Sequence, residues 1–135
     1  CIRDRGIPVI GYGTDEFPAF FTRESGLDAP HRCNTAKEVA AAMHAKWTIG
    51  LEGGILVANP IPASAAAEPK AIETAIESGL LKASEQGIQG QTLTPFLLRF
   101  INESTGGASL AANRQLVESN VRLGAEIAMA YATLR

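Results

Sequence analysis

Two short stretches of the chain are apolar without regular alternation of polar residues. Residues 7–12 read Ile-Pro-Val-Ile-Gly-Tyr, and residues 53–58 read Gly-Gly-Ile-Leu-Val-Ala. A strand with one solvated face alternates apolar and polar residues, whereas a parallel strand covered on both faces by helices does not. The pattern therefore predicts two buried parallel strands.

Most of the remaining chain carries apolar residues at the three- and four-residue spacing of amphipathic helices. One predicted buried stripe consists of Val39, Met43 and Trp47, and another consists of Ile72, Ile76, Leu80 and Ala83. Thr35 and Glu38 form a capping-box pattern, and Gly87 is a natural left-handed terminator. We expect helices at residues 35–47, 69–87, 94–105 and 109–134, and a shorter one that begins at Pro18 and ends near Gly26. Residues 28–34 are expected to form a loop. The order of elements predicts an α/β fold, rich in helix, with about two parallel strands.

Asn59 directly follows the second predicted strand and precedes Pro60. Proline biases its predecessor towards extended geometry and cannot donate to a continuing ladder, so the strand ends here. The carboxyl ends of parallel strands are where open α/β sheets usually bind ligands. Asn59 is therefore a candidate binding residue. The alternative is that Asn59 only begins a turn, with its side chain bonded to its own backbone.

The last predicted helix has an apolar face that two amides interrupt. This face carries Leu116, Leu123, Ile127 and Leu134 together with Asn113 and Asn120. A buried amide without a hydrogen bond costs on the order of a few kcal/mol, so both need partners from the protein or from a ligand. With Ser109 as the cap, Asn113 lies in the first turn, which favours a functional role because free helix N–H groups attract polar ligands. Asn120 fits a ligand contact and a register-fixing contact equally well.

Composition limits the remaining possibilities. The 135 residues suffice for one modest domain, and 46% hydrophobic with 19% charged residues is typical of a globular protein. No apolar run approaches the roughly 20 residues of a membrane helix, and a formal charge of −2 gives no reason to expect nucleic acid. Cys1 and Cys33 show no metal-ligand spacing, which favours a reducing compartment, the cytoplasm. The chain begins without methionine and predicts a strand almost at once, so we expect residues 1–135 to be a single partial domain of a longer product.

Other candidate motifs favour structural roles. Gly11 and Gly13 follow a strand, but the third glycine of a dinucleotide loop is missing and Asp15 stands where a phosphate would approach. His31 and Arg32 have the charge to bind an anion, although an exposed loop pair of this kind is more often only solvated. His44 has no cysteine, aspartate or second histidine near it in sequence and favours a structural role.

Several segments together resemble pseudouridine-5′-phosphate glycosidases, in order and over nearly the whole chain. The matching segments are residues 14–20, 25–32, 44–47, 53–62, 93–98 and 109–113, including Gly-Gly-Ile-Leu-Val-Ala-Asn-Pro-Ile-Pro and Ser-Leu-Ala-Ala-Asn. The resemblance implies the carboxyl-terminal part of an α/β/α protein that assembles as a homotrimer. It also implies the reversible cleavage of pseudouridine 5′-phosphate to uracil and ribose 5-phosphate, with a divalent metal, usually manganese.

The resemblance also implies how the reaction proceeds and which residues take part. The family forms a Schiff base between a lysine and the sugar C1′, because a carbon–carbon glycosidic bond has no leaving-group heteroatom to protonate. The family's catalytic lysine, metal ligand, acid–base glutamate and most phosphate contacts fall before Cys1, so none is assigned to Lys37, Lys46, Lys70 or Lys82. Asn113 matches the asparagine that contacts uracil, and Asn59 matches a family position without a firm role.

Two other functions remain open at this stage. The chain fits a non-catalytic fragment that acts as an oligomerisation or interaction module. It also fits an unrelated α/β domain that binds a small nucleotide-like ligand.

Overall fold

The computed structural model describes residues 6–66 and 68–134. The elements in chain order are β1 (Val9–Tyr12), β2 (His31–Cys33), α1 (Ala36–Thr48), β3 (Leu56–Ala58), α2 (Pro69–Glu85), a 3₁₀ turn (Gly90–Thr92), α3 (Leu93–Ser104) and α4 (Ala108–Ala132). The predicted α/β class is confirmed. Cys1 and the other residues of the amino-terminal five lie outside the described part of the chain.

The described sheet has three parallel strands in the order β2-β1-β3. Ile10 of β1 pairs with His31 on one side and Val57 on the other. The two predicted strands are confirmed as β1 and β3. The expected loop at residues 28–34 was wrong in part, because β2 forms within it. The strand has only three residues and exposes His31 and Arg32, so it lacks an apolar run and depends on pairing with β1.

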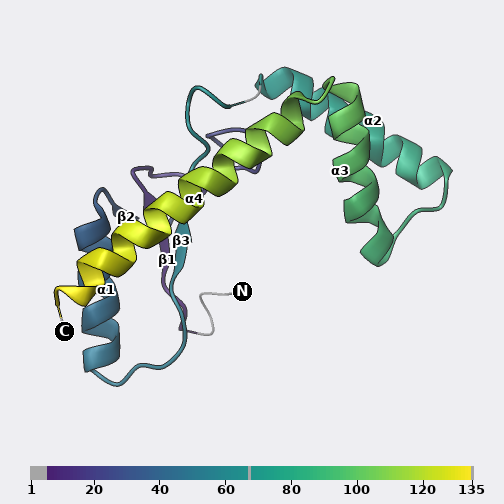
Figure 1. Cartoon of the computed structure of the whole chain (residues 1–135). Coiled ribbons are helices and arrows are strands. Elements are labelled where there is room, and N and C mark those ends of the chain that lie inside the picture. The colour runs from purple at the N-terminus through teal and green to yellow at the C-terminus, as the bar shows by residue number, and fades with distance from the viewer. Residues whose placement is uncertain (1–5, 67, 135) are drawn as a thin grey trace.

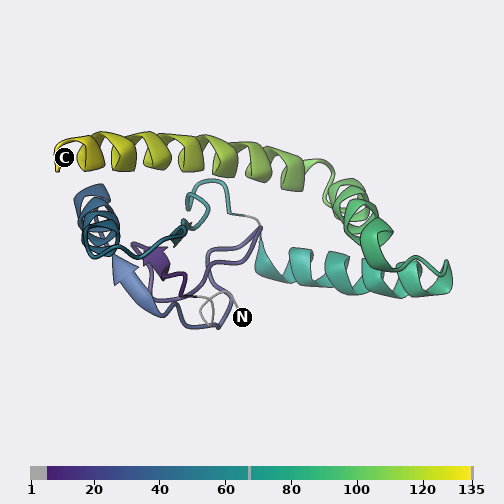
Figure 2. The same cartoon turned by 90° about the horizontal axis from the view of Figure 1, so that it is seen from below.

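A core between the sheet and two helices holds one end of the molecule together. Ile10 of β1, Val39 of α1, and Leu123 and Ile127 of α4 pack against each other. Figure 2 shows α1 lying between α4 and the strands in this part of the molecule. Leu123 and Ile127 of the apolar face predicted for the last helix therefore pack in this core, and Leu116 packs against Ile61 in a separate cluster. Leu134, also predicted on this face, is 40% exposed, which corrects the prediction at the end of the helix.

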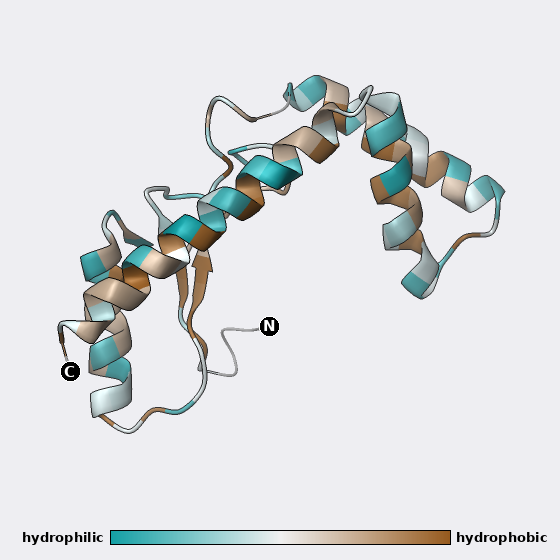
Figure 3. Cartoon of the chain, viewed as in Figure 1, coloured by the Kyte–Doolittle hydropathy of each residue, from teal (hydrophilic) through white to brown (hydrophobic). Residues whose placement is uncertain are grey.

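The helices α2 and α3, here called the helical arm, extend away from the sheet (Figure 1). They approach closely at Gly79, where an added Cβ would lie 3.0 Å from side-chain atoms of both Leu97 and Phe100. Gly87 ends α2 with a φ of 65°, and the N–H of Ile88 bonds the Ala83 carbonyl at 2.9 Å, which confirms the predicted terminator. Figure 3 shows apolar residues along both helices of the arm.

Residues 17–26 form no helix, which corrects the prediction made from Pro18. They form a loop whose ends meet, since Glu16 pairs with Asp28 and the Phe17 N–H bonds the Leu27 carbonyl at 2.7 Å. The Glu16 carboxylate also accepts the backbone N–H groups of Ser25 and Gly26 at 3.0 and 2.9 Å. These long-range bonds satisfy backbone groups that a helix would otherwise use.

The faces of two predicted helices are also corrected. Val39 is fully buried in α1, but Trp47 at the end of the predicted stripe is 38% exposed. Leu80, expected on the inner face of α2, is 45% exposed, and Ala75 and Gly79 are buried instead. α4 begins at Ala108 after Gly107, so Ser109 is not its cap and Asn113 lies in the second turn.

Candidate functional site

A small cavity lies where the 17–26 loop meets the junction of α3 and α4. Its volume is about 170 Å³, and its lining residues are Phe20, Phe21, Leu98, Asn102, Ser109, Leu110 and Asn113. Pockets for drug-sized ligands have roughly 300–1,000 Å³. The cavity is therefore sized for a small planar molecule rather than for a whole nucleotide.

Each wall of the cavity is fixed by local structure. The closed 17–26 loop presents Phe20 and Phe21, whose rings meet edge to face with centroids 4.6 Å apart. The α3–α4 junction is held by Thr105, whose hydroxyl donates to the Ile101 carbonyl at 2.8 Å and accepts the Ser109 N–H at 3.3 Å. Asn113 follows Ser109 by four residues and so lies on the same side of α4. The predicted binding residue Asn113 therefore lines a half-open site whose walls are largely aromatic and aliphatic.

Two polar residues of this cavity were not singled out from the sequence as binding residues. Asn102 lies in the last turn of α3, and its Oδ1 atom is buried without a hydrogen-bond partner. Ser109 is only 2% exposed, and its hydroxyl has no side-chain hydrogen bond within the described residues. Ser109 and Asn113 are the two ends of the 109–113 segment that resembles the family, and their four-residue spacing places them on one side of α4, whereas no sequence signal links Asn102 to them.

A side-chain hydrogen bond joins Asn59 to Asn120. The Asn59 amide donates to the Asn120 side-chain oxygen at 2.9 Å and to the Ser119 hydroxyl at 3.0 Å. These bonds join the carboxyl end of β3 to the middle of α4. The structure therefore separates Asn59 and Asn120 from the Asn113 cavity and gives them protein partners.

The charged loop candidates also have protein partners. Arg32 contacts the Asp15 carboxylate at 2.5 Å and donates to the Asn34 side chain at 2.8 Å.

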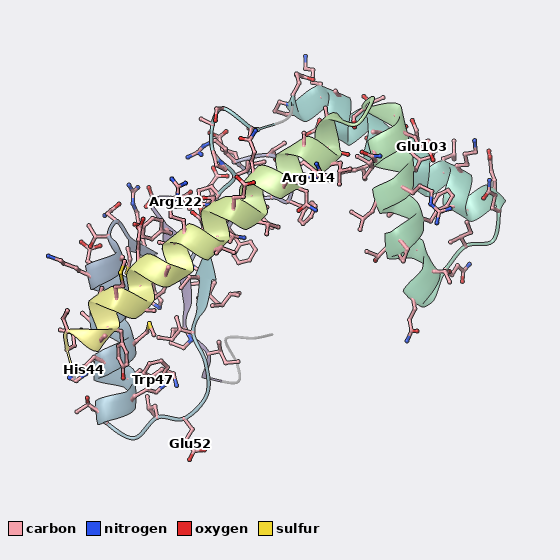
Figure 4. The ribbon with its side chains drawn as sticks, viewed as in Figure 1. His44, Trp47, Glu52, Glu103, Arg114 and Arg122 are labelled. Carbon is pink, nitrogen blue, oxygen red and sulfur yellow. The ribbon has the colours of Figure 1, made fainter. Side chains whose placement is uncertain are left out.

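His44 and Trp47 lie near the C-terminal end of α4 (Figure 4), where the Trp47 and Tyr131 ring centroids are 5.2 Å apart. Neither histidine is brought into the cavity that Asn113 lines.

Lys46 is buried, unlike Lys37, Lys70 and Lys82, which are exposed. Its ammonium donates to the backbone carbonyls of Leu51, Glu52 and Gly53 in the connection that follows α1. An ammonium held by three carbonyls is a structural cap. Lys46 therefore does not face a substrate cavity.

No group of three or more histidine, cysteine, aspartate or glutamate side chains within the described residues is placed to hold a metal ion. Cys33 lies beside the core, and its pKa is raised by burial of the thiol and, to a smaller extent, by the Glu38 carboxylate. A raised pKa disfavours the thiolate that binds metals. The described residues do not themselves fit a manganese ion, whose ligand the resemblance does not assign to residues 1–135.

A larger apolar cavity of about 580 Å³ adjoins the small one and shares Phe20, Phe21 and Leu98 with it. The remaining lining residues come from the 17–26 loop and from the helical arm. It holds Thr22, Glu24 and Ser25 at its loop side but brings no amide into its interior. The small cavity is therefore the better candidate for a polar planar ligand.

Comparison with known proteins identifies the family. A sequence model described as indigoidine synthase A like protein matches residues 1–130. This chain belongs to the indigoidine synthase A-like family. Within the described residues, no helix of this indigoidine synthase A-like chain is both long and apolar enough to cross a membrane.

Curated relatives of this indigoidine synthase A-like chain are named pseudouridine-5′-phosphate glycosidase, which confirms the resemblance drawn from the motifs. One from Petrotoga mobilis is 52% identical over 126 residues, and one from a Nocardioides species is 52% identical over 130 residues. These alignments cover 93% and 96% of this chain but 41% and 42% of the relatives. The chain thus spans about two fifths of the length of the curated relatives it matches.

Solved structures of similar proteins share the fold. A prealnumycin C-glycosynthase in complex with ribulose 5-phosphate matches with a TM-score of 0.89 and 29% identity, over 98% of this chain and 44% of that one. An indigoidine synthase A-like protein from Thermotoga maritima matches with a TM-score of 0.80 and 35% identity, over 99% of this chain and 43% of that one. The second match supports the family assignment independently.

Proposed function

We propose that this chain forms the base-binding part of an enzyme that reversibly cleaves pseudouridine 5′-phosphate to uracil and ribose 5-phosphate. The relatives named for that activity are about 50% identical across nearly all of the chain. The single structural observation that supports the proposal is the small cavity that contains Asn113. It has the size, the aromatic wall and the polar group that a free pyrimidine base requires.

The carbon–carbon bond dictates what the rest of the enzyme must supply. Uracil leaves through a ring carbon, so the sugar needs an electron sink, and an iminium formed by a lysine at C1′ provides one. We assign that lysine to a part of the protein outside residues 1–135, because Lys46 is capped by carbonyls and Lys37, Lys70 and Lys82 are exposed on helices. The manganese ion and the acid–base carboxylate are proposed to be held by that same part of the protein, outside residues 1–135.

Asn113 is proposed to hold the base while the bond forms or breaks. Its amide offers one donor and one acceptor, which complement a carbonyl and the adjacent N–H of uracil. The position on α4 places the amide on a rigid element rather than on a loop. A homotrimer of the full-length protein is part of the same proposal, by family resemblance.

A second candidate function is carbon–carbon bond formation between a sugar phosphate and a larger aromatic acceptor. It is favoured by the match to a prealnumycin C-glycosynthase and by the larger apolar cavity beside the small one. A third is an interaction module without catalysis.

One experiment distinguishes the three functions. The full-length protein that contains this chain is incubated with ribose 5-phosphate, a manganese salt and either uracil or a bicyclic aromatic acceptor, and the products are identified by mass. Formation of pseudouridine 5′-phosphate supports the proposed function. A product only with the larger acceptor supports the second function, and no product with either acceptor supports the third.

A further inference from the structure

Three polar side chains that line the small cavity have polar atoms without a hydrogen-bond partner in the protein. Among the described residues, the side chains of Asn102, Ser109 and Asn113 all lack a recorded protein partner at one or more of their polar atoms. Buried polar groups in native proteins are nearly always bonded, and Ser109 is only 2% exposed, so its unpaired hydroxyl at the wall of the cavity calls for an explanation. A ligand in the cavity that bonds this hydroxyl is that explanation, whereas the Asn102 Oδ1 atom is sealed from solvent and lies out of a ligand's reach.

The amide of Asn102 presents a donor to the cavity. Its Oδ1 atom is sealed from solvent and unpaired, while the residue as a whole remains partly accessible and lines the cavity. The accessible end of the amide is therefore Nδ2, which donates only. A buried oxygen without a hydrogen bond lowers the stability of the protein by about 1–3 kcal/mol.

The Ser109 hydroxyl is a second available donor. The residue is 2% exposed, and its one recorded contact with a polar side chain uses the backbone N–H rather than the hydroxyl. Because Ser109 lines the cavity, its hydroxyl is free to bond a molecule inside it. Ser109 and Asn113 share a side of α4, so a planar molecule reaches both at once.

We propose that Asn102 and Ser109 determine base specificity together with Asn113. Uracil has an edge of carbonyl, N–H and carbonyl, which requires donor, acceptor and donor from the protein. Asn113 provides one donor and the acceptor, and Asn102 or Ser109 provides the other donor. Cytosine replaces one carbonyl with an amino group and the N–H with a bare nitrogen, so it sets donor against donor and acceptor against acceptor. This inference rests on the proposed function and adds the residues that read the base.

The test compares Asn102→Ala and Ser109→Ala with Ser104→Ala in the full-length protein that contains this chain. Ser104 is exposed near the end of α3 and serves as the matched control. The rate of pseudouridine 5′-phosphate synthesis is measured against uracil and against ribose 5-phosphate, and cytosine is tested as a competitive inhibitor. Thermal unfolding of each variant is measured in parallel.

We expect at least one of the two variants to raise the KM for uracil by about 5- to 10-fold, as the loss of one hydrogen bond implies. The KM for ribose 5-phosphate should not change, and the preference for uracil over cytosine should narrow. Neither variant should lower the unfolding temperature, because neither side chain has a protein partner to lose. Ser104→Ala should behave as the unmodified protein in every measurement.

Two results overturn the inference. One is an unchanged uracil KM in both variants, and the other is a loss of thermal stability that accounts for the whole kinetic effect. Failure of the proposed function is distinguishable, because the unmodified protein would then make no pseudouridine 5′-phosphate from uracil. In that case binding of uracil to the unmodified protein and to the variants, measured by calorimetry, decides whether the cavity reads the base.

Discussion

The buried ammonium of Lys46 gives a test that separates a structural lysine from a catalytic one. Lys46 lies in the last turn of α1, where a cation also stabilises the carbonyl end of the helix. Its Nζ atom donates to the carbonyls of Leu51 at 3.1 Å and Gly53 at 3.4 Å, and to that of Glu52. The Trp47 indole N–H also bonds the Gly53 carbonyl, at 3.2 Å. The connection from α1 to β3 is thus held chiefly by one side chain.

The Lys46→Met variant keeps most of the apolar stem and removes the ammonium. A hydrogen bond to a charged group contributes about 1.5–3 kcal/mol, and the longest of the three contributes least. Water can reach part of the connection once it opens, which recovers some of the loss. We therefore expect Lys46→Met to destabilise residues 49–56 by about 2–4 kcal/mol.

Hydrogen exchange in the full-length protein that contains this chain measures this effect locally. The Leu51 N–H bonds the Lys46 carbonyl and the Leu56 N–H bonds the Pro8 carbonyl, so both report on the connection. A loss of 2–4 kcal/mol should speed their exchange by roughly 30- to 1,000-fold. Lys37→Met, on the exposed side of the same helix, should change exchange by less than about threefold, in keeping with the small effect of most surface substitutions.

The reasoning would be refuted by unchanged exchange in Lys46→Met. It would also be refuted if that variant lost its sugar–lysine adduct on borohydride reduction while exchange stayed normal. That second result would make Lys46 the Schiff-base lysine and would move the chemistry into this chain.

Three further predictions concern chemistry. In the full-length protein that contains this chain, Asn113→Ala should lower uracil-dependent synthesis by about 10-fold while ribose 5-phosphate still forms its Schiff base, and Asn113→Asp should be worse because it removes the donor; collapse of folding with normal uracil kinetics would make Asn113 a core residue. The isolated chain should trap no ribose 5-phosphate on borohydride reduction, and mass mapping that finds an adduct on any of its lysines would contradict this. Alkylation of Cys33 should be slow at neutral pH and should accelerate only above the ordinary thiol pKa of 9.0, because burial and Glu38 raise the pKa; peptide mapping over a pH series measures it, and rapid labelling at pH 7 would contradict the cause.

The elements that the sequence predicted well are those whose signal is local. β1 and β3 have apolar runs that end at glycine or proline, and α1 has a capping box in which Thr35 and Glu38 bond each other's backbone as predicted. Their formation depends on neighbours within a few residues. The four α-helices that form were therefore predictable, with boundaries wrong by one or two residues, whereas the helix predicted from Pro18 does not form.

The elements that the sequence missed depend on distant partners. β2 has no apolar run, and only pairing with β1 makes it a strand. The 17–26 loop begins with the proline typical of a helix start, but Glu16 binds backbone N–H groups nine and ten residues further on. No local spacing encodes such a bond. The same holds for Asn102, which joins the cavity only because α3 and α4 meet at Thr105.

Asn59 and Asn113 show what the structure adds to a pattern that both share. Each amide follows or interrupts an apolar segment, so the sequence marks both as polar groups in need of partners. The Asn59 amide donates hydrogen bonds to Ser119 and Asn120, and these bonds join β3 to α4. This structural role explains why an amide stands at position 59. Asn113 has no hydrogen-bond partner within the described residues, and it lines a cavity together with Ser109 and Asn102. Because the Asn113 amide has no protein partner and lines a cavity, whereas the Asn59 amide is engaged by α4, the ligand hypothesis belongs to Asn113 rather than to Asn59.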